Sequence, residues 1–128
     1  MEFQRVYSGA PWEEKVGYCR ALRAGNAVFV TGTAAVAEGG GVHAPGDAYA
    51  QTRRCLDIIR AALEKLRVGM ERVVRTRLYV TDIARWEEYG RAHREAFPDS
   101  PPTTTMVEVQ RLIHPDMLVE VETEAVAE

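Results

Sequence analysis

Residues 47–69 contain the strongest periodic pattern in this 128-residue chain. Small and apolar side chains recur there at intervals of three and four, which places them along one side of an α-helix. This stripe consists of Thr52, Cys55, Leu56, Ile59, Leu63 and Leu66. Asp47 is suited to cap the start of the helix, and Gly69 to the left-handed conformation at its end. A helix with one apolar stripe must pack against another element, which the rest of the chain has to supply.

Six other segments have the alternating or β-branched patterns that are typical of strands. They cover residues 3–7, the two sides of a turn at 24–26, 72–80, 105–111 and 118–125. Residues 81–97 are predicted to form a second helix, whose apolar side carries Ile83, Trp86, Tyr89, His93 and Phe97. Residues 8–17 are interpreted as a turn. The order β-β-β-α-β-α-β-β predicts a single α+β domain over residues 1–128, with both helices on one face of a mixed sheet.

Side-chain alternation gives this sheet an apolar face for the helices and a polar face. The polar face is expected to carry Arg75, Arg77, Glu108, Glu120 and Glu122. Two interpretations stay open. The polar face is either exposed to water, or it is a subunit interface in which acids and arginines pair.

Charge and composition argue against several kinds of partner. The chain has 16 basic and 19 acidic residues, and its net charge of −3 predicts that it has no nucleic-acid partner. No apolar run approaches the roughly 18 residues of a membrane span, and no signal-peptide pattern is present. We therefore expect a cytoplasmic protein without a membrane partner.

Few residues of the chain suggest a metal, cofactor or disulfide. Its two cysteines, Cys19 and Cys55, do not form a disulfide framework, and Cys55 is expected to be a buried apolar residue. The histidines have no short spacing between them, so no metal site is predicted. No nucleotide-binding or serine-hydrolase motif is present, and no cofactor is expected.

Three segments together resemble the YjgF/Rid family, the reactive-intermediate deaminases. They are GYCRALRAGNAVFVTG at 17–32, RTRLYVTDI at 75–83 and PPTTTMVEVQRLIHPDMLVEVETEAVA at 101–127. The likeness covers nearly the whole chain in the same order. It implies a chorismate-mutase-like fold assembled as a homotrimer, in which the sheets form a central barrel and ligand clefts lie between neighbouring subunits. The polar sheet face would then be internal.

The resemblance also implies a function for each cleft, which in the deaminases binds a small 2-imino acid and hydrolyses its C=N bond to a 2-oxo acid and ammonia. Glu120 matches a family acid that orients or deprotonates the attacking water. The positions implied to bind substrate are Tyr18, Thr31, Gly32, Trp86, Thr104 and Thr105.

Position 104 departs from the family pattern, which has a carboxylate-binding arginine there. The hydroxyl of Thr104 offers a neutral hydrogen bond where a guanidinium offers two charge-assisted ones. Gly90 similarly replaces a family asparagine. Two functions therefore stay open: hydrolysis of reactive imines or enamines, and non-catalytic metabolite binding or regulation by a trimer. For the first, Thr104 argues against 2-iminobutanoate and 2-iminopropanoate as substrates. Arg77 or Arg111 could supply the missing charge.

Ordinary structural roles are open for the same positions. Glu120 could pair with Arg75 or Arg77 on the sheet face, and Trp86 could pack in the core. Tyr18 could be a half-buried strand aromatic. A glycine within a strand, such as Gly32, indicates a bulge, a close approach or simply a bend at the end of the strand.

Overall fold

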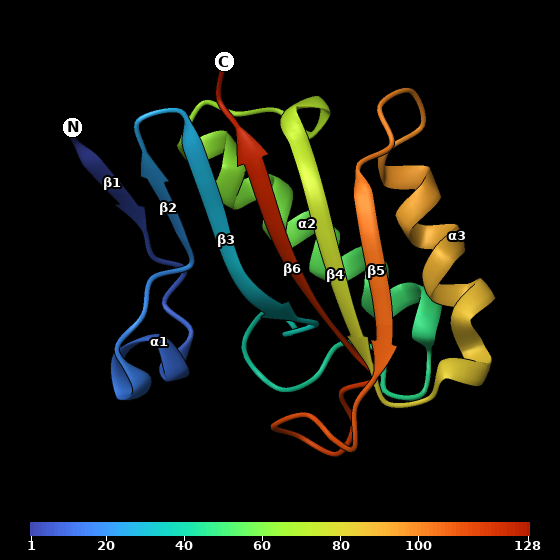
Figure 1. Cartoon of the computed structure of the whole chain (residues 1–128). Helices are drawn as coiled ribbons and strands as arrows, with labels where there is room; N and C mark the ends of the chain where they lie inside the picture. Colours follow the sequence, from blue (N-terminus) through green and yellow to red (C-terminus); the bar gives the residue numbers. More distant parts are fainter.

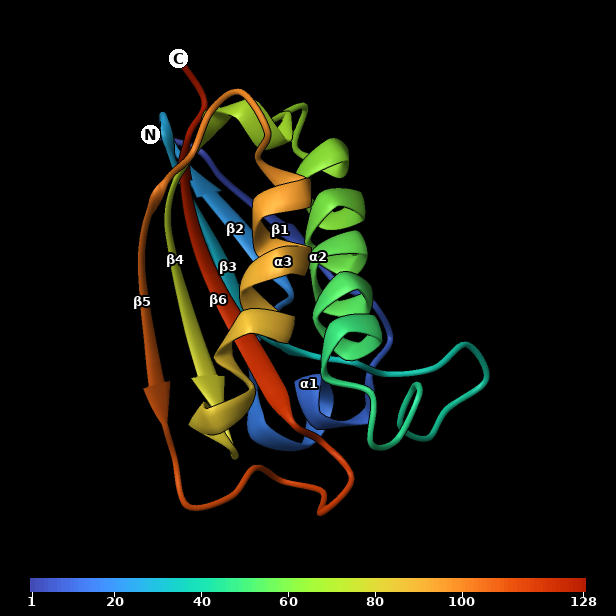
Figure 2. The ribbon, with the colours of Figure 1, turned by 90° about the vertical axis from the view of Figure 1, so that its right-hand side faces the viewer.

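A twisted six-stranded sheet covered on one face by two helices forms the body of the molecule, as the computed structural model of residues 1–128 shows (Figures 1 and 2). In chain order the main elements are β1 (Phe3–Val6), α1 (Pro11–Val16), β2 (Ala21–Ala24), β3 (Ala27–Ala34), α2 (Ala48–Lys65), β4 (Val73–Val80), α3 (Trp86–Ala96), β5 (Thr103–Glu108) and β6 (Val119–Val126). Single 3₁₀ turns, η1 (Met70–Arg72) and η2 (Ile83–Arg85), precede β4 and α3. The predicted α+β fold, with α2 and α3 on one face, is confirmed.

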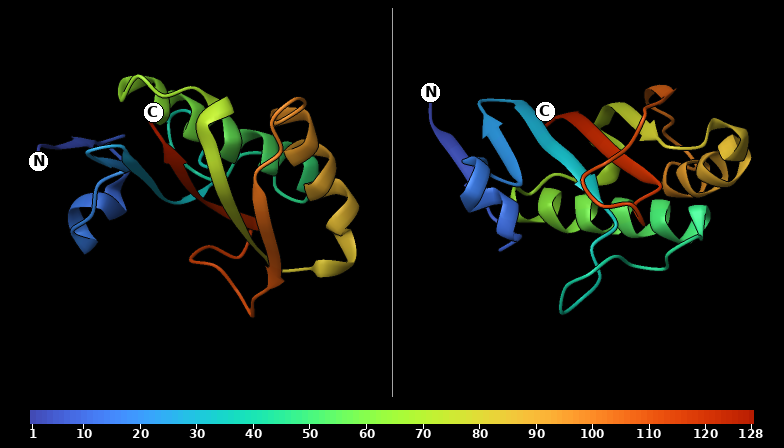
Figure 3. Two further views of the ribbon diagram at one scale, coloured as in Figure 1. Left: turned by 45° about the horizontal axis from the view of Figure 1, so that its top comes forward. Right: turned by 90° about the horizontal axis from the view of Figure 1, so that it is seen from below.

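The strands follow the order β1-β2-β3-β6-β4-β5. Only β4 and β5 are parallel, so the sheet is mixed as predicted. A parallel pair needs a crossover, which α3 supplies beside α2. The hairpin between β2 and β3 turns at Gly25, which has a φ of 62°. Figure 3 shows that α1 and α3 lie at opposite ends of the molecule.

Helix α2 begins at Asp47, whose side chain accepts a hydrogen bond from the backbone N–H of Ala50 at 2.9 Å. Its inner side packs on the sheet through Cys55, Ile59 and Leu63, each 0% exposed. The predicted stripe is thus the core side of the helix.

The end of α2 differs from the prediction. Arg67, and not Gly69, takes the left-handed conformation, with a φ of 61°. The backbone N–H groups of Arg67 and Val68 donate to the carbonyls of Glu64 and Leu63, both at 3.0 Å, which is the hydrogen-bond pattern of a Schellman motif. The prediction for Gly69 was wrong because the helix ends where Val68, 3% exposed, can join the core.

Residues 8–17 contain a short helix, α1, where the sequence pattern indicated a turn. Pro11 occupies the first turn, where a helix does not need its missing N–H. Gly17 ends the helix in the left-handed conformation, with a φ of 91°. Six residues are too few to show a helical period, so this element could not be recognised from its pattern.

Strand β5 presents its faces in the opposite sense to the prediction. Its parallel register places Met106 beside Leu78 and Glu108 beside Val80, so both side chains lie on the helix side. Met106 packs against the core, and Glu108 accepts a hydrogen bond from the backbone N–H of Ile83 at 3.1 Å. Placing Glu108 on the polar face was therefore wrong, because a shift by one residue exchanges the two faces of a strand.

The sheet face away from the helices carries cross-strand ion pairs between β4 and β6. Arg75 pairs with Glu124 at 3.0 Å, and Arg77 pairs with Glu122 at 3.1 Å. No element of the chain covers this face (Figure 2), and Phe29, which lies on it opposite Glu124, is 45% exposed.

Replacing Ile59 by alanine tests the packing of α2 on the sheet. The variant leaves a cavity in a fully buried site, so we expect it to lower the free energy of unfolding by about 2–5 kcal/mol. Urea unfolding followed by circular dichroism, at one fixed protein concentration, measures the change. The matched control is Ile83→Ala, at a residue that is 39% exposed, which should cost less than about 1 kcal/mol. Equal losses in the two variants would contradict this assignment of the core.

Candidate functional site

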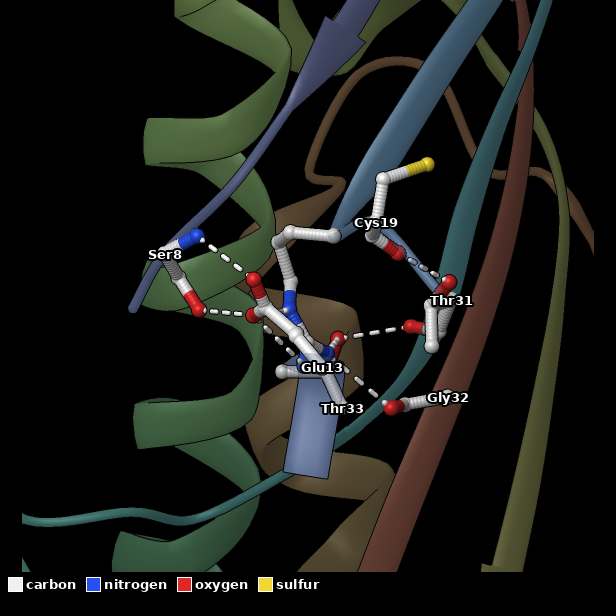
Figure 4. A network of polar contacts seen from close by, with 7 residues as sticks. Ser8, Glu13, Cys19, Thr31, Gly32 and Thr33 are labelled. Atoms are coloured by element: carbon white, nitrogen blue, oxygen red, sulfur yellow. Dashed lines mark hydrogen bonds and ion pairs between the residues drawn. The ribbon is translucent and has the colours of Figure 1, made fainter. Parts of the chain in front are cut away.

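A buried ion pair between Glu13 and Arg20 joins α1 to strand β3. The two residues are 5% and 6% exposed, and Nη2 of Arg20 lies 3.2 Å from Oε2 of Glu13. Nη1 of Arg20 donates to the carbonyl of Gly32 and to Oγ1 of Thr33, both at 3.1 Å. Glu13 also accepts from the hydroxyl and the backbone N–H of Ser8 (Figure 4). Both charges are therefore compensated by hydrogen bonds, as a buried pair requires.

The backbone of β3 is irregular at Thr31 and Gly32, where its register with β6 shifts. The hydroxyl of Thr31 donates to the carbonyl of Cys19 at 2.7 Å, which holds the irregular stretch against the start of β2 (Figure 4). A Cβ atom at position 32 would lie 2.5 Å from Oε1 of Glu120. A side chain at position 32 would therefore displace the Glu120 carboxylate from the backbone, and this close approach is one of the alternatives that a strand glycine indicates.

A cavity of about 610 Å³ opens beside this irregular stretch. Its walls come from α1, the end of β3, the loop that follows it, α2 and the segment before β6. Its polar side chains include Tyr18, Arg20, Arg54 and Glu120. The structure thus brings Tyr18, Gly32 and Glu120 of the predicted site together, with Thr31 immediately adjacent.

Glu120 forms no ion pair, although it lies on the sheet face that carries the arginines. Arg75 and Arg77 instead pair with the two acids that follow Glu120 on that face of β6, so the structural alternative for Glu120 is not observed. Burial raises the pKa of Glu120 above its ordinary value of 4.5, the charge of Arg20 opposes this, and the charge of Glu122 adds to it. A cavity-lining carboxylate with a raised pKa has the properties of a general base.

The other predicted site residues lie on α3 and on β5, the edge strand on the opposite side of the sheet from β1 and α1 (Figure 1). Trp86 begins α3 and is 57% exposed, so it does not pack in the core. Thr104 lies on the helix side of β5, where its Oγ1 accepts a hydrogen bond from the hydroxyl of Thr76 at 2.7 Å. Thr76 in turn lies 2.7 Å from Nε2 of His93. Thr105 is the next residue of the strand and therefore faces the opposite side.

The two groups of residues cannot meet within one chain. Strand β4 separates β6 from β5, so these two strands lie about 10 Å apart. Glu120 is opposite Tyr79 and Thr104 is opposite Thr76, which separates them by three further residues along β4. Their side chains also point to opposite faces of the sheet. A ligand could contact both groups only where two copies of the chain meet.

Three residues of this region, Glu13, Arg20 and Arg54, were not among the predicted site residues. Glu13 lies in α1, where a turn was expected, and Arg54 lies outside the predicted apolar stripe of α2. One signal was present for Arg54. Ile58 follows it by one helical turn and lies outside the main apolar stripe, and both residues line the cavity.

Other reactive groups do not converge on this cavity. No group of three or more His, Cys, Asp or Glu side chains is arranged to hold a metal ion. Burial raises the pKa of the Cys55 thiol, which stays protonated in the core. None of the helices combines the length and the apolar character that crossing a bilayer would need.

Replacing Glu13 by alanine tests the ion pair. The change leaves Arg20 buried without its partner, so we expect the free energy of unfolding to fall by about 3–5 kcal/mol at neutral pH. The control is Glu14→Ala, at the exposed neighbouring residue, which should unfold like the unaltered protein. Urea unfolding of all three proteins measures these differences.

The same comparison has a defined pH dependence. Burial alone would raise the pKa of Glu13, but the hydrogen bonds from Ser8 and the charge of Arg20 outweigh it and lower that pKa below the ordinary 4.5. A carboxyl with a lowered native pKa stabilises the fold above its unfolded pKa and loses this contribution as the pH falls through the native value. The gap between the unaltered protein and Glu13→Ala should therefore narrow below about pH 4.5. A gap that stays constant to lower pH would contradict this account of the carboxyl.

The sequence also matches known proteins over most of its length. A family model described as Endoribonuclease L-PSP matches residues 10–127. SCO2049 of Streptomyces coelicolor is 40% identical over 122 residues, which are 95% of this chain and 90% of that protein. The 3-aminoacrylate deaminase RutC of Acinetobacter baylyi is 32% identical over 104 residues, which are 81% of this chain and 82% of RutC.

The solved structures agree with the sequence matches. The crystal structure of Rv2704 from Mycobacterium tuberculosis, a member of the YjgF/YER057c/UK114 family, has a TM-score of 0.88 and 44% identity, covering 98% of this chain and 99% of that one. The irregular stretch of β3, Gly32 and Glu120 thus occur in a chain that matches this family over nearly its whole length. The chain belongs to the YjgF/Rid family, whose sequence model is described as Endoribonuclease L-PSP.

Proposed function

We propose that this protein binds a small imine or enamine in clefts between the subunits of a homotrimer and hydrolyses its C=N bond. The observation that carries the proposal is Glu120, a cavity-lining carboxylate that forms no ion pair and has a raised pKa. The RutC relative is a 3-aminoacrylate deaminase, and this supports release of ammonia from a small nitrogen compound as the reaction type.

The proposed reaction needs only water as a second reactant. Glu120 accepts a proton from a water molecule while the water oxygen bonds to the C=N carbon and the π electrons move to nitrogen. Glu120 passes this proton to the nitrogen, which gives a neutral carbinolamine. It then takes the hydroxyl proton and delivers it to the amino group as the C–N bond breaks, so Glu120 ends ionised. An enamine enters the same sequence after it tautomerises to the imine. One water is consumed, and one carbonyl compound and one ammonia are released.

The uncovered sheet face supports the assembly. Phe29 and Val107 on this face are 45% and 43% exposed, beside half-exposed ion pairs that a partner could cover. In a trimer of the family type, the cavity with Glu120 would face Trp86, Thr104 and Thr105 of the next subunit. Because Thr104 accepts its hydrogen bond from Thr76, its own hydroxyl proton is free to donate to a ligand.

Sedimentation measures the assembly directly. We expect a particle of three 14.3 kDa chains at micromolar concentration. Replacing Phe29 by lysine adds a charge to the uncovered face and should shift the particle toward single chains. Replacing Ala61, an exposed residue of α2 in the layer on the other side of the sheet, by lysine adds the same charge away from this face and serves as the control. A particle of one chain for the unaltered protein would remove the intersubunit cleft.

The catalytic role of Glu120 is tested by Glu120→Gln, which removes the base and retains the size of the side chain. We expect ammonia release from imines, generated in situ by an amino-acid oxidase, to fall by about 10²- to 10⁴-fold. The matched control is Glu122→Gln, the next acid on the same face, which already pairs with Arg77 and should keep the rate within a few-fold. If Glu120→Gln hydrolyses imines as fast as the unaltered protein, the assignment fails.

The pKa of Glu120 also gives the proposed reaction a pH dependence. Only the ionised carboxylate can accept the proton, so the rate should rise with pH through a value above 4.5. Glu120→Gln should lose this rising limb, whereas Glu122→Gln should retain it.

The neutral hydroxyl at position 104 supports a second candidate, a non-catalytic trimer that binds a metabolite. Without a guanidinium at that position, a carboxylate there would bind about 10- to 100-fold more weakly. This alternative predicts no acceleration with any imine. It also predicts a rise in Tm with a metabolite of another class in a thermal-shift screen.

A further inference from the structure

Arg54 is an arginine of the cavity whose charge has no partner. Its Nε–H donates to the carbonyl of Val36 at 2.8 Å, and the side chain makes no other hydrogen bond and no ion pair. Arg20, the other arginine that lines the cavity, is fully engaged with Glu13 and the end of β3. Arg54 therefore has terminal N–H groups that are free for a ligand.

The contact with Val36 also orients the guanidinium of Arg54. Holding Nε in place fixes the plane of the group and leaves Nη1 and Nη2 as a fork, which suits two parallel bonds to a carboxylate. The side chain is half-buried, so water screens its charge less than at the surface. An anionic ligand would compensate a cation that no protein group neutralises.

Arg54 and Glu120 line the same cavity without pairing. No ion pair joins them, and a molecule in this cavity can contact both the guanidinium and the carboxylate. The lining also includes Ile58, one turn after Arg54, and Met117, and the volume of about 610 Å³ is in the range of sites for drug-sized ligands.

We infer that Arg54 binds the carboxylate of the substrate, and that the substrate is an imino or enamino acid with a large apolar side chain. This inference rests on the proposed function, because it places the reacting C=N carbon beside Glu120. Thr104 of the neighbouring subunit supplies no positive charge to the cleft. Arg54 supplies it instead, from the same subunit as Glu120. Arg77 is committed to Glu122 and Glu124, and Arg111 does not line the cavity.

A binding experiment tests the carboxylate site without requiring turnover. Calorimetric titration compares 4-methyl-2-oxopentanoate with its neutral amide, 4-methyl-2-oxopentanamide. We expect Arg54→Met to weaken binding of the acid by about 10- to 100-fold and to leave binding of the amide unchanged. Arg54→Lys keeps the charge but loses the fork, and should lie between Arg54→Met and the unaltered protein.

Arg53→Met is the matched control. Arg53 precedes Arg54 on α2, is exposed, contacts Tyr49 and does not line the cavity. The Arg53→Met substitution makes the same change in charge and size on the same helix but outside the cavity. Binding of both ligands should therefore stay as in the unaltered protein. Unfolding curves of the variants establish that each one is folded.

Three results would overturn the inference. Equal weakening of the acid and the amide in Arg54→Met would mean that Arg54 only shapes the cavity. An acid affinity that is unchanged in Arg54→Met, or lowered as much in Arg53→Met, would remove its specific role. Inorganic phosphate that binds as tightly as the acid, with the same loss in Arg54→Met, would make this a phosphate site.

Kinetics separate the failure of this inference from the failure of the proposed function. L-Leucine and an amino-acid oxidase serve as the imine source. Arg54→Met should raise KM by about 10- to 100-fold, the factor expected for a lost charged hydrogen bond. Glu120→Gln should instead lower kcat. Hydrolysis that depends on Glu120 but not on Arg54 would overturn the inference alone. Acid binding through Arg54 without any ammonia release above the buffer rate would overturn the proposed hydrolysis and retain the carboxylate site.

Discussion

The buried pair of Glu13 and Arg20 is the interaction on which the candidate site depends. A buried ion pair adds little net stability over apolar residues of similar size, because desolvation offsets most of its Coulomb energy. Here the ion pair instead fixes the positions of two backbone segments. One guanidinium holds α1 through Glu13 and the irregular end of β3 through the carbonyl of Gly32, at 3.1 Å. Since Gly32 lies directly against the Glu120 carboxylate, the same contacts fix the wall on which that carboxylate rests.

Cross-strand register explains why Glu120, among the three acids on its face of β6, is left unpaired. Strand β4 places Arg75 opposite Glu124 and Arg77 opposite Glu122. The next residue of β4 on that face is Tyr79, which lies opposite Glu120 and donates its hydroxyl hydrogen bond to Glu122 instead. The two arginines therefore neutralise Glu124 and Glu122. Glu120, at the cavity, is left unpaired and has a raised pKa. The sequence of β4 thus determines which acid of β6 is left without an ion pair.

The central strands and α2 could be predicted because one of their faces is uniformly apolar and a single period describes them. Strand β5 lies at the edge and begins with three threonines, which suit either face. The apolar residues that follow, Met106 and Val107, point to opposite faces, so the sequence of the strand does not determine which face meets the helices. The end of α2 depends on burial of Val68, a tertiary contact that overrides the glycine signal. The cavity is built from four separate stretches of the chain, so no local pattern could bring Arg20, Arg54 and Glu120 together.

The two walls of the proposed cleft differ in charge, and this difference would orient a ligand. Burial lowers the pKa of His93, so the imidazole behind Thr76 and Thr104 is neutral near pH 7, and that wall offers hydroxyl donors without a formal charge. The cation that is free to act on a ligand lies on α2, at Arg54. A carboxylate would therefore turn toward α2, away from the threonines, because a charged hydrogen bond is stronger than a neutral one. Replacing one arginine on an edge strand by threonine need not abolish acid recognition in such a cleft, since a second arginine on a different element can reverse the direction in which the acid binds.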